Sequence, residues 1–518
     1  MNLSGIQNIS LESSGSVVDD EFIIKHNDLI SRVAEEFGDS FAAIASPTLS
    51  KQETVTSLYL SIKEGLARGH RRPPFPRRLL VEFLPRLTWM LVRIVYASLR
   101  FRVRRISEGA VIFRTWLVPR SLEGPALFDD YFRQLPEDLA AHENVVVSFT
   151  STDFGLLNQF GRARKSENQI ISYGLLGLSD VAKLFWDYTF TALIQAKKKY
   201  YLDNVDITAY INRSLLLDYV TLQSFEAYAE KFKCQKLIEH KIKSFVYVFE
   251  NQSWEKACCA TLRGHDIRLI GYQSSGFSSI FLNFFPTEED ARRQPMPDII
   301  LTVGNYFCRY LTEHGHYQTP VEPFAALRFS YQNTGGRYLV LLPNPDIIGR
   351  VLYAFPVHIE QYIDTINDLI GVFQGSGVDI DLKLHPLYRL NEIKEFPTLP
   401  ENFRVVTTVD MDCLRDTYDC VLFNDNSFGI EAMLKGVRSY QYSRNGSFAD
   451  DRFMYFDLWQ VNYVLSDIKT LLHKIQSRSY EKVFDVDAVS EYINALYCPY
   501  TPSSLKRFRE LVNSCYLD

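Results

Sequence analysis

Residues 379–386 read DIDLKLHP, and we expect them to form a buried strand that runs straight into His-Pro. A second strand begins residues 420–434, CVLFNDNSFGIEAML, where it runs into a polar turn that opens a helix. Parallel strands end at the same edge of a sheet, and helix N-termini at that edge bind anions. The two stretches together predict a pocket for an anionic ligand at the carboxyl edge of a parallel sheet.

Strands alternate with helices along most of the chain, which predicts parallel sheets covered by helices on both faces. A Gly-containing stretch at 333–337, NTGGR, is typical of a linker, and the alternation begins again after it. The predicted fold class is therefore α/β, with two Rossmann-like domains that face a cleft. We expect a helical extension over residues 1–108, an acceptor domain over 109–333 and a donor domain with closing helices over 334–518.

The composition is that of a globular enzyme, and the net charge of −6 argues against a surface built for nucleic acid. The eight cysteines include no CxxC pair and no spacing that suits zinc, so we expect buried thiols in a reducing cytoplasm and no metal. The first residues lack the pattern of a signal peptide. No apolar run reaches the roughly 20 residues of a membrane span.

An arginine-rich segment covers residues 68–105, with eleven arginines against the single acid Glu82. Aromatic and aliphatic residues are interleaved with the arginines, which is typical of a helix that lies on an anionic membrane surface. The alternative is a helix packed on the protein with an arginine-rich outer face, and the pattern leaves both open. Nucleic acid is less favoured, because no recognised binding motif accompanies the arginines.

The strand at 379–386 offers cationic groups to the predicted pocket. His385 can donate to a phosphate, and Pro386 fixes the direction of the chain as it leaves the strand. Lys383 lies two residues back, on the same strand face. The alternative is a structural histidine that caps a turn.

The turn at 424–429 offers hydrogen-bond donors to the same pocket. Asn426, Ser427 and the backbone N–H groups at the helix start form an anion site, and Gly429 permits close approach of the backbone. Glu431 lies one turn into the helix, where it could accept hydrogen bonds from ribose hydroxyls. The alternative is an ordinary N-cap by Asn426 or Ser427.

The first half of the chain supplies candidate acids at its strand ends. Glu250 follows a strand and could act as base or nucleophile, whereas the alternative is an acid that complements a helix dipole, which Glu255 fits better. Asp153, after an earlier strand, competes for the catalytic role.

Aromatic and polar groups accompany these acids at other strand ends. Trp254 suits the face of a sugar, Gln273 and Ser274 can hydrogen-bond a donor, and Arg114 with Trp116 could bind an acidic acceptor. Capping of loops is the alternative for these residues.

Several motifs follow one another in an order that carries a resemblance. They are ENQSWEKA (250–257), IGYQSS (270–275), PDIILTVGNYF (297–307), AALRFSY (325–331), LKLHP (382–386) and NDNSFGIEAMLKG (424–436). Over roughly residues 110–480 the chain resembles bacterial capsule and O-antigen glycosyltransferases of the GT-B type, allied to the Kdo and sialic-acid transferases that use CMP-sugars. The resemblance implies that His385, Pro386 and Ser427 hold cytidine monophosphate.

The resemblance implies a glycosyltransferase that moves a 2-keto sugar acid from a CMP-sugar to a surface-glycan acceptor, without a metal or other cofactor. We expect it in the cytoplasm, peripheral on the inner membrane if residues 68–105 dock there. The alternatives are a CDP-glycerol-type polyol-phosphate transferase, an enzyme that uses a UDP-sugar, and a non-catalytic scaffold of a polysaccharide assembly complex.

Overall fold

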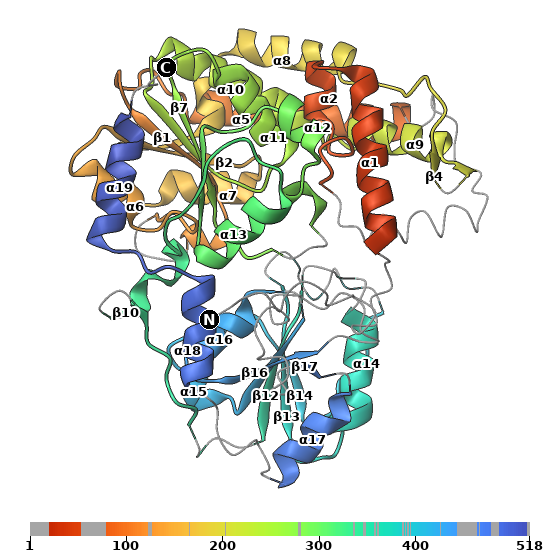
Figure 1. The fold of residues 1–518 in the computed structure, drawn as a ribbon, viewed down its shortest axis with the longest axis vertical. Helices are drawn as coiled ribbons and strands as arrows, with labels where there is room; N and C mark the ends of the chain where they lie inside the picture. Colours follow the sequence, from red (N-terminus) through yellow and green to blue (C-terminus); the bar gives the residue numbers. More distant parts are fainter. Residues whose placement is uncertain are drawn as a thin grey trace. The chain divides into compact units, whose positions relative to one another are not determined.

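The computed structural model (Figure 1) shows two compact units, each built on a parallel sheet with helices around it. The first unit comprises residues 21–274, 280–331 and 497–518, and the second comprises residues 332–496 with 275–279. The residues that the structure describes are 20–52, 79–122, 127–164, 166–202, 204–277, 281–334, 337–344, 346, 349–356, 359, 362–385, 388, 390, 393, 395–424, 426–442, 464–465, 467–477 and 486–514.

The sheet of the first unit has the strand order β3-β2-β1-β6-β7-β8-β9, and all its neighbours are parallel. Its strands are β1 (Val111–Trp116), β2 (Val145–Thr150), β3 (Gln169–Ile171), β6 (Ser244–Val248), β7 (Arg268–Gln273), β8 (Ile299–Thr302) and β9 (Val321–Pro323). The chain moves outward from β1 to β3 and then returns to β6 on the other side of β1. The order therefore reverses between β1 and β6, which is where ligands bind in open parallel sheets.

Helices cover this sheet and extend beyond it. They are α1 (Asp20–Phe37), α2 (Phe41–Ala45), α5 (Leu84–Arg100), α6 (Leu135–Ala140), α7 (Phe154–Arg162), α8 (Leu178–Thr191), α9 (Thr208–Val220), α10 (Phe225–Glu239), α11 (Ser253–Leu262), α12 (Glu288–Arg293), α13 (Asn305–His314) and α19 (Pro502–Asn513). A short antiparallel hairpin joins β4 (Tyr201–Leu202) to β5 (Val205–Asp206). None of the helices in the described part of the chain combines the length and apolarity that a bilayer crossing requires.

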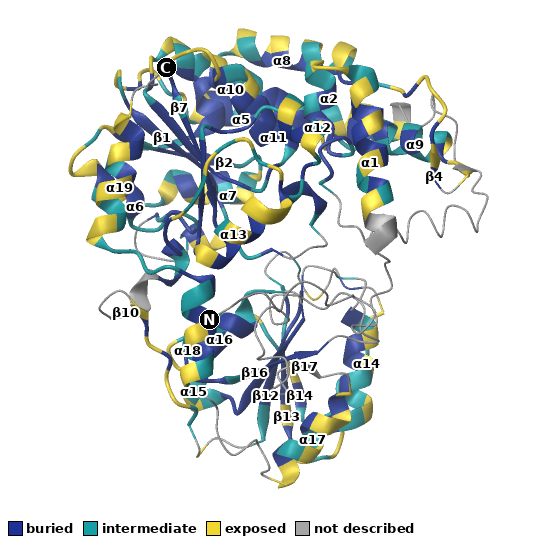
Figure 2. Ribbon diagram, in the orientation of Figure 1, coloured by how far each residue is buried: buried dark blue, intermediate teal, exposed yellow. Residues whose placement is uncertain are grey.

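Alternate side chains of β1 point to opposite faces of the sheet, as strand geometry requires. Arg114 points to α10, where it pairs with Glu230. Phe113 points to α19, where its ring centroid lies 5.8 Å from that of Phe508. Figure 2 shows the strands of this sheet as buried, while α8 and α19 expose their outer faces.

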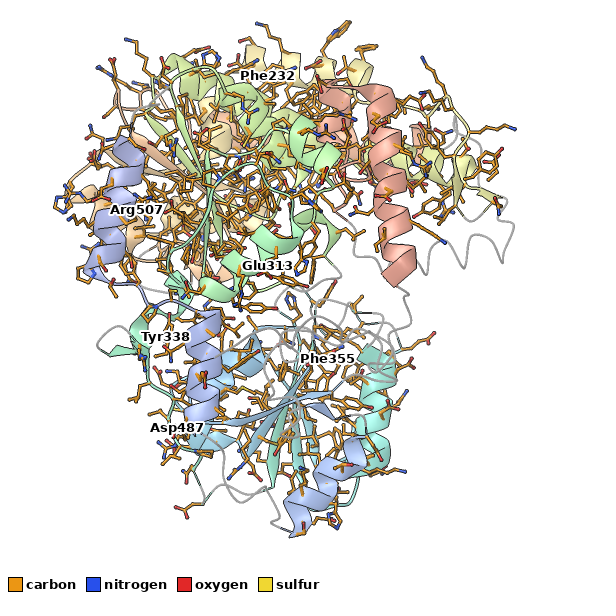
Figure 3. The ribbon with its side chains drawn as sticks, viewed as in Figure 1. Phe232, Glu313, Tyr338, Phe355, Asp487 and Arg507 are labelled. Atoms are coloured by element: carbon orange, nitrogen blue, oxygen red, sulfur yellow. The ribbon has the colours of Figure 1, made fainter. Side chains whose placement is uncertain are left out.

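The C-terminal helix α19 belongs to the first unit and not to the domain that the sequence predicts over 334–518. Phe508 packs against Phe113 and also against Phe324, at a centroid distance of 5.5 Å. The hydroxyl of Ser244 donates a hydrogen bond to the carbonyl of Val512. Arg507, labelled in Figure 3, forms an ion pair with Glu322 on the surface. These contacts join segments far apart in the chain, so no local pattern predicts them.

The sheet of the second unit has the order β14-β13-β12-β15-β16-β17, again with parallel neighbours. Its strands are β12 (Arg350–Ala354), β13 (Asp379–Lys383), β14 (Phe403–Val406), β15 (Cys420–Phe423), β16 (Arg438–Tyr442) and β17 (Val464–Leu465). This order reverses between β12 and β15. The α/β class and the two Rossmann-like parallel sheets that the sequence predicts are confirmed.

Two apolar clusters cover the two faces of this second sheet. One joins Tyr353 and Leu382 to α14 (Tyr362–Phe373) and α17 (Ile468–Ser477). The other joins Leu352 to α15 (Leu414–Thr417) and α16 (Phe428–Leu434). The helix α18 (Val486–Leu496) packs on α16 and on β11 (Arg337–Tyr338), where Asn494 binds the backbone of Tyr338, labelled in Figure 3.

We expect Phe508→Ala to destabilise the first unit by about 3–5 kcal/mol, the usual cost of removing a buried phenylalanine ring. Urea unfolding followed by fluorescence measures the loss. Lys506→Ala, at an exposed position of the same helix, is the matched control and should change stability by less than about 0.5 kcal/mol. Equal effects of the two substitutions would contradict the anchoring of α19 by Phe508.

Candidate functional site

The two stretches of the predicted anion pocket lie on either side of β12. β13 carries His385 just beyond its carboxyl end, and β15 leads into Asn426 and Ser427. The side-chain amide of Asn426 donates a hydrogen bond of 2.9 Å to the carbonyl of Ala354, at the end of β12. Asn426 also accepts a hydrogen bond from the N–H of Phe428. The turn is thereby fixed to the point where the strand order reverses. Ser427 is the N-cap residue of α16 but forms no side-chain capping bond, whereas Asn426, one residue earlier, binds the N–H of the first helical residue.

Lys383 brings the two stretches into contact. Its Nζ atom lies 5.0 Å from the ring centroid of Phe428, the first residue of α16. A cation above an aromatic face is attracted by the ring quadrupole, so the two groups stabilise each other. Both side chains are partly exposed. The amino group of one stretch therefore lies beside the helix start of the other, as the predicted pocket requires.

His385 is held through its backbone. Its N–H donates to the hydroxyl of Tyr362 at 3.3 Å, and that hydroxyl donates to the carbonyl of Pro356 at 2.7 Å. The ring of Tyr362 also packs on Phe355, labelled in Figure 3, at a centroid distance of 4.3 Å. The position of the histidine at the strand end thus rests on a buried tyrosine. Pro386 lies outside the described residues.

Ser427 and Glu431 bind each other across the first turn of α16. The serine hydroxyl donates to the glutamate carboxylate at 3.2 Å. Both side chains are partly exposed, and their predicted roles toward phosphate and ribose stay predictions. Gly429 is buried, and a Cβ atom there would lie 2.2 Å from the ring of Phe423. The glycine therefore allows α16 to pack closely on the end of β15.

In the first unit, the loop after β6 presents Glu250 at the reversal of strand order. The carboxylate of Glu255 accepts hydrogen bonds of 2.9 Å from the N–H groups of Glu250 and Asn251. Asn251 has φ +54°, an uncommon backbone conformation for a residue other than glycine. Asn283 exchanges hydrogen bonds with this loop, donating to the carbonyl of Glu250 and accepting from the side chain of Asn251. Glu255 thus takes the helix N-terminal role, as its position in the sequence favoured.

The carboxylate of Glu250 is held by a chain of side-chain hydrogen bonds. Gln252 donates to it at 2.6 Å, and the indole N–H of Trp254 donates to Gln252 at 2.8 Å. Burial raises the pKa of Glu250, and the nearby charge of Arg114 opposes that shift. A carboxyl group with a raised pKa, positioned at a strand end, suits general acid–base chemistry.

Arg114 is buried beside Trp254, the last residue of this series of hydrogen bonds, with 1% of its surface exposed. Its guanidinium lies 3.8 Å and 3.6 Å from the ring centroids of Trp116 and Trp254, and its Nε donates to Glu230 at 2.8 Å. Trp254 is also buried. Burial gives Arg114 and Trp254 a supporting role in this structure in place of direct acceptor binding. Trp116 is partly buried, and its acceptor role stays a prediction.

Three further predicted residues lie elsewhere at the carboxyl edge of the first sheet. Gln273 is buried and accepts a hydrogen bond from the N–H of Val303, and Ser274 is buried beside it. Asp153 is exposed and caps α7 by accepting from the N–H of Leu156 at 2.9 Å. The structure therefore places Glu250, and not Asp153, at the reversal of strand order.

The residues predicted for the site do not include Asp130, Tyr131 and Arg328, which form a group near Glu250. The pKa of Tyr131 is raised to about 12 by burial and by the negative charge of Glu250, while Arg328 opposes the shift. Asp130 forms ion pairs with Arg133 at 3.0 Å and with Arg328 at 4.0 Å. The polar run FDDY at 128–131, which follows the first strand, is the signal that could have identified Asp130 and Tyr131. No local pattern marks Arg328.

Three buried residues of the first unit have the ligand types of a metal site, namely Glu230, Cys234 and Cys258, with their ligand atoms within 4.8 Å of one another. Glu230 already pairs with Arg114 at 2.8 Å and with Lys233 at 2.9 Å. Two cations beside this carboxylate oppose the binding of a further positive charge. Burial raises the pKa of the Cys258 thiol, which also disfavours the thiolate that a metal needs.

No protein-family model matches the chain. No curated protein matches it either. Some solved structures are similar to the chain at low identity. The glycosyltransferase SnogD from Streptomyces nogalater is 14% identical, with coverage of 79% of this chain and 100% of that one, and a TM-score of 0.42.

Two other solved structures are similar at the same level. The UDP-N-acetylglucosamine 2-epimerase from Rickettsia bellii is 11% identical and covers 78% of this chain and 96% of its own, with a TM-score of 0.45. The spinosyn rhamnosyltransferase SpnG, complexed with thymidine diphosphate, is 12% identical. The match covers 78% of this chain and 100% of that one, with a TM-score of 0.42. No residue role follows from similarities at this level. The resemblance to Kdo and sialic-acid transferases stays a prediction.

The raised pKa of Glu250 predicts a pH-dependent stability. The unfolded chain releases this proton near the ordinary pKa of 4.5, whereas the folded chain holds it to higher pH. The free energy of unfolding therefore falls as the pH rises from 4.5 through the raised pKa. Glu250→Gln removes this loss, so the variant should gain stability relative to the parent as the pH rises.

Thermal unfolding midpoints of parent and variant, measured from acid to mildly alkaline pH, test this expectation. Glu137→Gln, at an exposed position of α6, is the matched control and should follow the parent. A constant difference between Glu250→Gln and the parent across the pH range would contradict the raised pKa.

Proposed function

We propose that this protein is a glycosyltransferase that moves a 2-keto sugar acid, Kdo or a sialic-like nonulosonate, from a CMP-sugar to a surface-glycan acceptor of capsule or O-antigen. The observation that carries the proposal is the contact between Lys383 and Phe428. It joins the His-Pro strand to the serine-bearing helix start at the reversal of strand order, where parallel sheets bind nucleotides. The six-stranded sheet would thus bind the donor.

The donor chemistry gives each of these residues a role. A CMP-sugar loses its sugar when the bond between the anomeric carbon and the phosphate oxygen breaks, and CMP leaves with the electron pair. Lys383, His385 and Ser427 would stabilise the charge that develops on this phosphate, so that the protein supplies groups that a metal supplies in other enzymes. Glu431 would bind the ribose.

The acceptor hydroxyl must lose a proton as it attacks, and Glu250 is the base that the structure favours. Its burial raises its pKa, which makes its carboxylate a stronger base than an exposed glutamate. Asp153 is engaged as the cap of α7 and is the weaker candidate. We propose that the glycan acceptor is linked to a lipid. Residues 68–105, of which the structure describes 79–105, would then lie at an anionic membrane surface.

CMP should stabilise the protein against thermal unfolding, because a ligand that binds the folded state at 100 times its Kd adds about 2.7 kcal/mol. Lys383→Ala and His385→Ala should each weaken CMP binding by about tenfold, the loss of one charge-assisted hydrogen bond. Lys469→Ala, at an exposed position of α17 in the same unit, is the matched control. The measurement is a titration of the full chain by calorimetry.

The same titration with CDP, UDP and thymidine diphosphate separates the alternatives. Preference for CDP would favour the polyol-phosphate transferase, and preference for UDP or thymidine diphosphate would replace the CMP-sugar by a nucleoside-diphosphate sugar. Failure of every nucleotide to bind would favour the scaffold and refute the proposed transfer.

Glu250→Gln should lower the rate of transfer by about 10²–10⁴, the usual contribution of a general base, and should leave CMP binding unchanged. Asp153→Asn should retain most of the rate, and it should also keep the cap of α7, because an asparagine side chain can accept the same hydrogen bond from Leu156. Single-turnover transfer from a CMP-sugar measures both. Full activity of Glu250→Gln with loss in Asp153→Asn would reverse the assignment of the base.

A further inference from the structure

The outer face of α8 carries an exposed apolar stripe. Leu178, Ala182, Trp186 and Phe190 follow one another at intervals of four residues, which places them on one side of the helix. The exposed fractions are 55% for Leu178, 70% for Trp186 and 65% for Phe190. The two rings lie 4.4 Å apart and form one projection. Large exposed rings that contact each other on a helix surface mark an interaction site.

The helix α5 lies beside α8 and runs antiparallel to it. At the start of α5, the ring of Phe83 stacks on Tyr188 near the end of α8, at a centroid distance of 6.4 Å. At the other end, the hydroxyl of Ser98 donates to the carbonyls of Tyr173 and Leu176, just before α8 begins. The two helices are therefore neighbours along their whole length.

The outer face of α5 is also apolar in part. Its exposed apolar residues are Leu84, Trp89, Val92 and Leu99, with 41%, 51%, 46% and 58% of their surfaces exposed. Its opposite face packs on the first unit through Ile94 and Ala97. The sequence left open whether this segment lies on a membrane or packs on the protein with an arginine-rich outer face. In the structure α5 packs on the protein and still presents an outer face that bears arginines, so the two interpretations are compatible.

Basic residues lie along α5 and in the segment that follows it. Between Glu82 and Glu108 the chain has six arginines and no acid. Five of these arginines are exposed: Arg86, Arg100, Arg102, Arg104 and Arg105. The acids of α8 are engaged by lysines of α10, since Asp187 pairs with Lys231 at 2.8 Å and Asp180 with Lys236 at 3.4 Å. Exposed positive charge is therefore concentrated on α5 and on the segment that follows it, while the acids of α8 are paired.

We propose that α5 and α8 together form a docking surface for an anionic lipid bilayer. Trp186, Phe190 and Trp89 would enter the headgroup layer, where aromatic side chains are favoured, and the arginines would bind the anionic headgroups. The arginine segment is evident in the sequence, whereas the exposed apolar stripe of α8 is evident only in the structure. This surface rests on the proposed function for its lipid-linked acceptor, and vesicle binding tests it separately from nucleotide binding.

Charge complementarity selects the bilayer over other occupants of this surface. A second copy of the chain, packed by two-fold symmetry, would place this arginine-bearing surface against the same surface of the other copy, at a cost in repulsion. Nucleic acid would satisfy the arginines but would leave the apolar stripe of α8 without a partner. An anionic bilayer satisfies both the charged and the apolar parts.

Sedimentation of the full-length protein with vesicles of phosphatidylcholine, with and without phosphatidylglycerol, tests the proposal. We expect binding to the anionic vesicles that weakens as salt rises. The double substitution Arg102→Ser with Arg104→Ser should weaken binding about fivefold for each arginine, corresponding to roughly 1 kcal/mol per basic residue. Trp186→Ser with Phe190→Ser should also weaken binding, and both variants should keep the thermal stability of the parent because all four side chains are exposed.

Matched controls remove similar groups from other surfaces. Leu342→Ser removes an apolar residue that is 63% exposed in the second unit, and Lys469→Ser with Lys506→Ser removes two exposed cations. These variants should bind vesicles as the parent does.

Four results would overturn the proposal. They are equal binding to neutral and anionic vesicles, unchanged binding by both test variants, binding of RNA in place of vesicles, and a lipid-free dimer that Trp186→Ser with Phe190→Ser converts to a monomer. The dimer result would assign the surface to contacts between copies of the chain.

Discussion

The guanidinium of Arg114 is a positive charge buried in the interior of the first unit, and the side chains around it neutralise that charge. A buried ion without partners costs several kcal/mol. Glu230 and Glu226 of α10 supply the counter-charges at 2.8 Å and 3.4 Å, which fixes α10 against β1. Lys233 pairs with both carboxylates and balances the second of them. Two cations and two anions thus form a cluster without net charge.

The same guanidinium links the interior to the candidate base. Trp254 covers one face of Arg114, and its indole N–H orients Gln252, which in turn holds the carboxylate of Glu250. In the second unit, close packing positions the residues of the predicted donor site. There the close approach of Gly429 to Phe423 sets the start of α16, and Lys383 contacts that start through Phe428.

The strand ends that carry the candidate site could be predicted because alternation of strands and helices is a local property of the sequence. Glu250, His385 and Ser427 lie where that alternation places them. The partners of Arg114 could not be predicted in this way. Glu226, Glu230 and Lys233 have the spacing of an exposed helix face with ion pairs, and the same spacing serves a buried cluster equally well. Only the packing of α10 on β1 distinguishes the two.

The sequence by itself determined the α/β class, the two parallel sheets and the polar residues that follow their strands, since each depends on residues close together in the chain. Tertiary structure alone decided that Glu250, and not Asp153, lies where the strand order reverses with its pKa raised by burial. It also decided that α19 joins the first unit and that α8 lies beside α5. Burial and charge pairing arise from contacts through space between distant segments, which local periodicity does not encode.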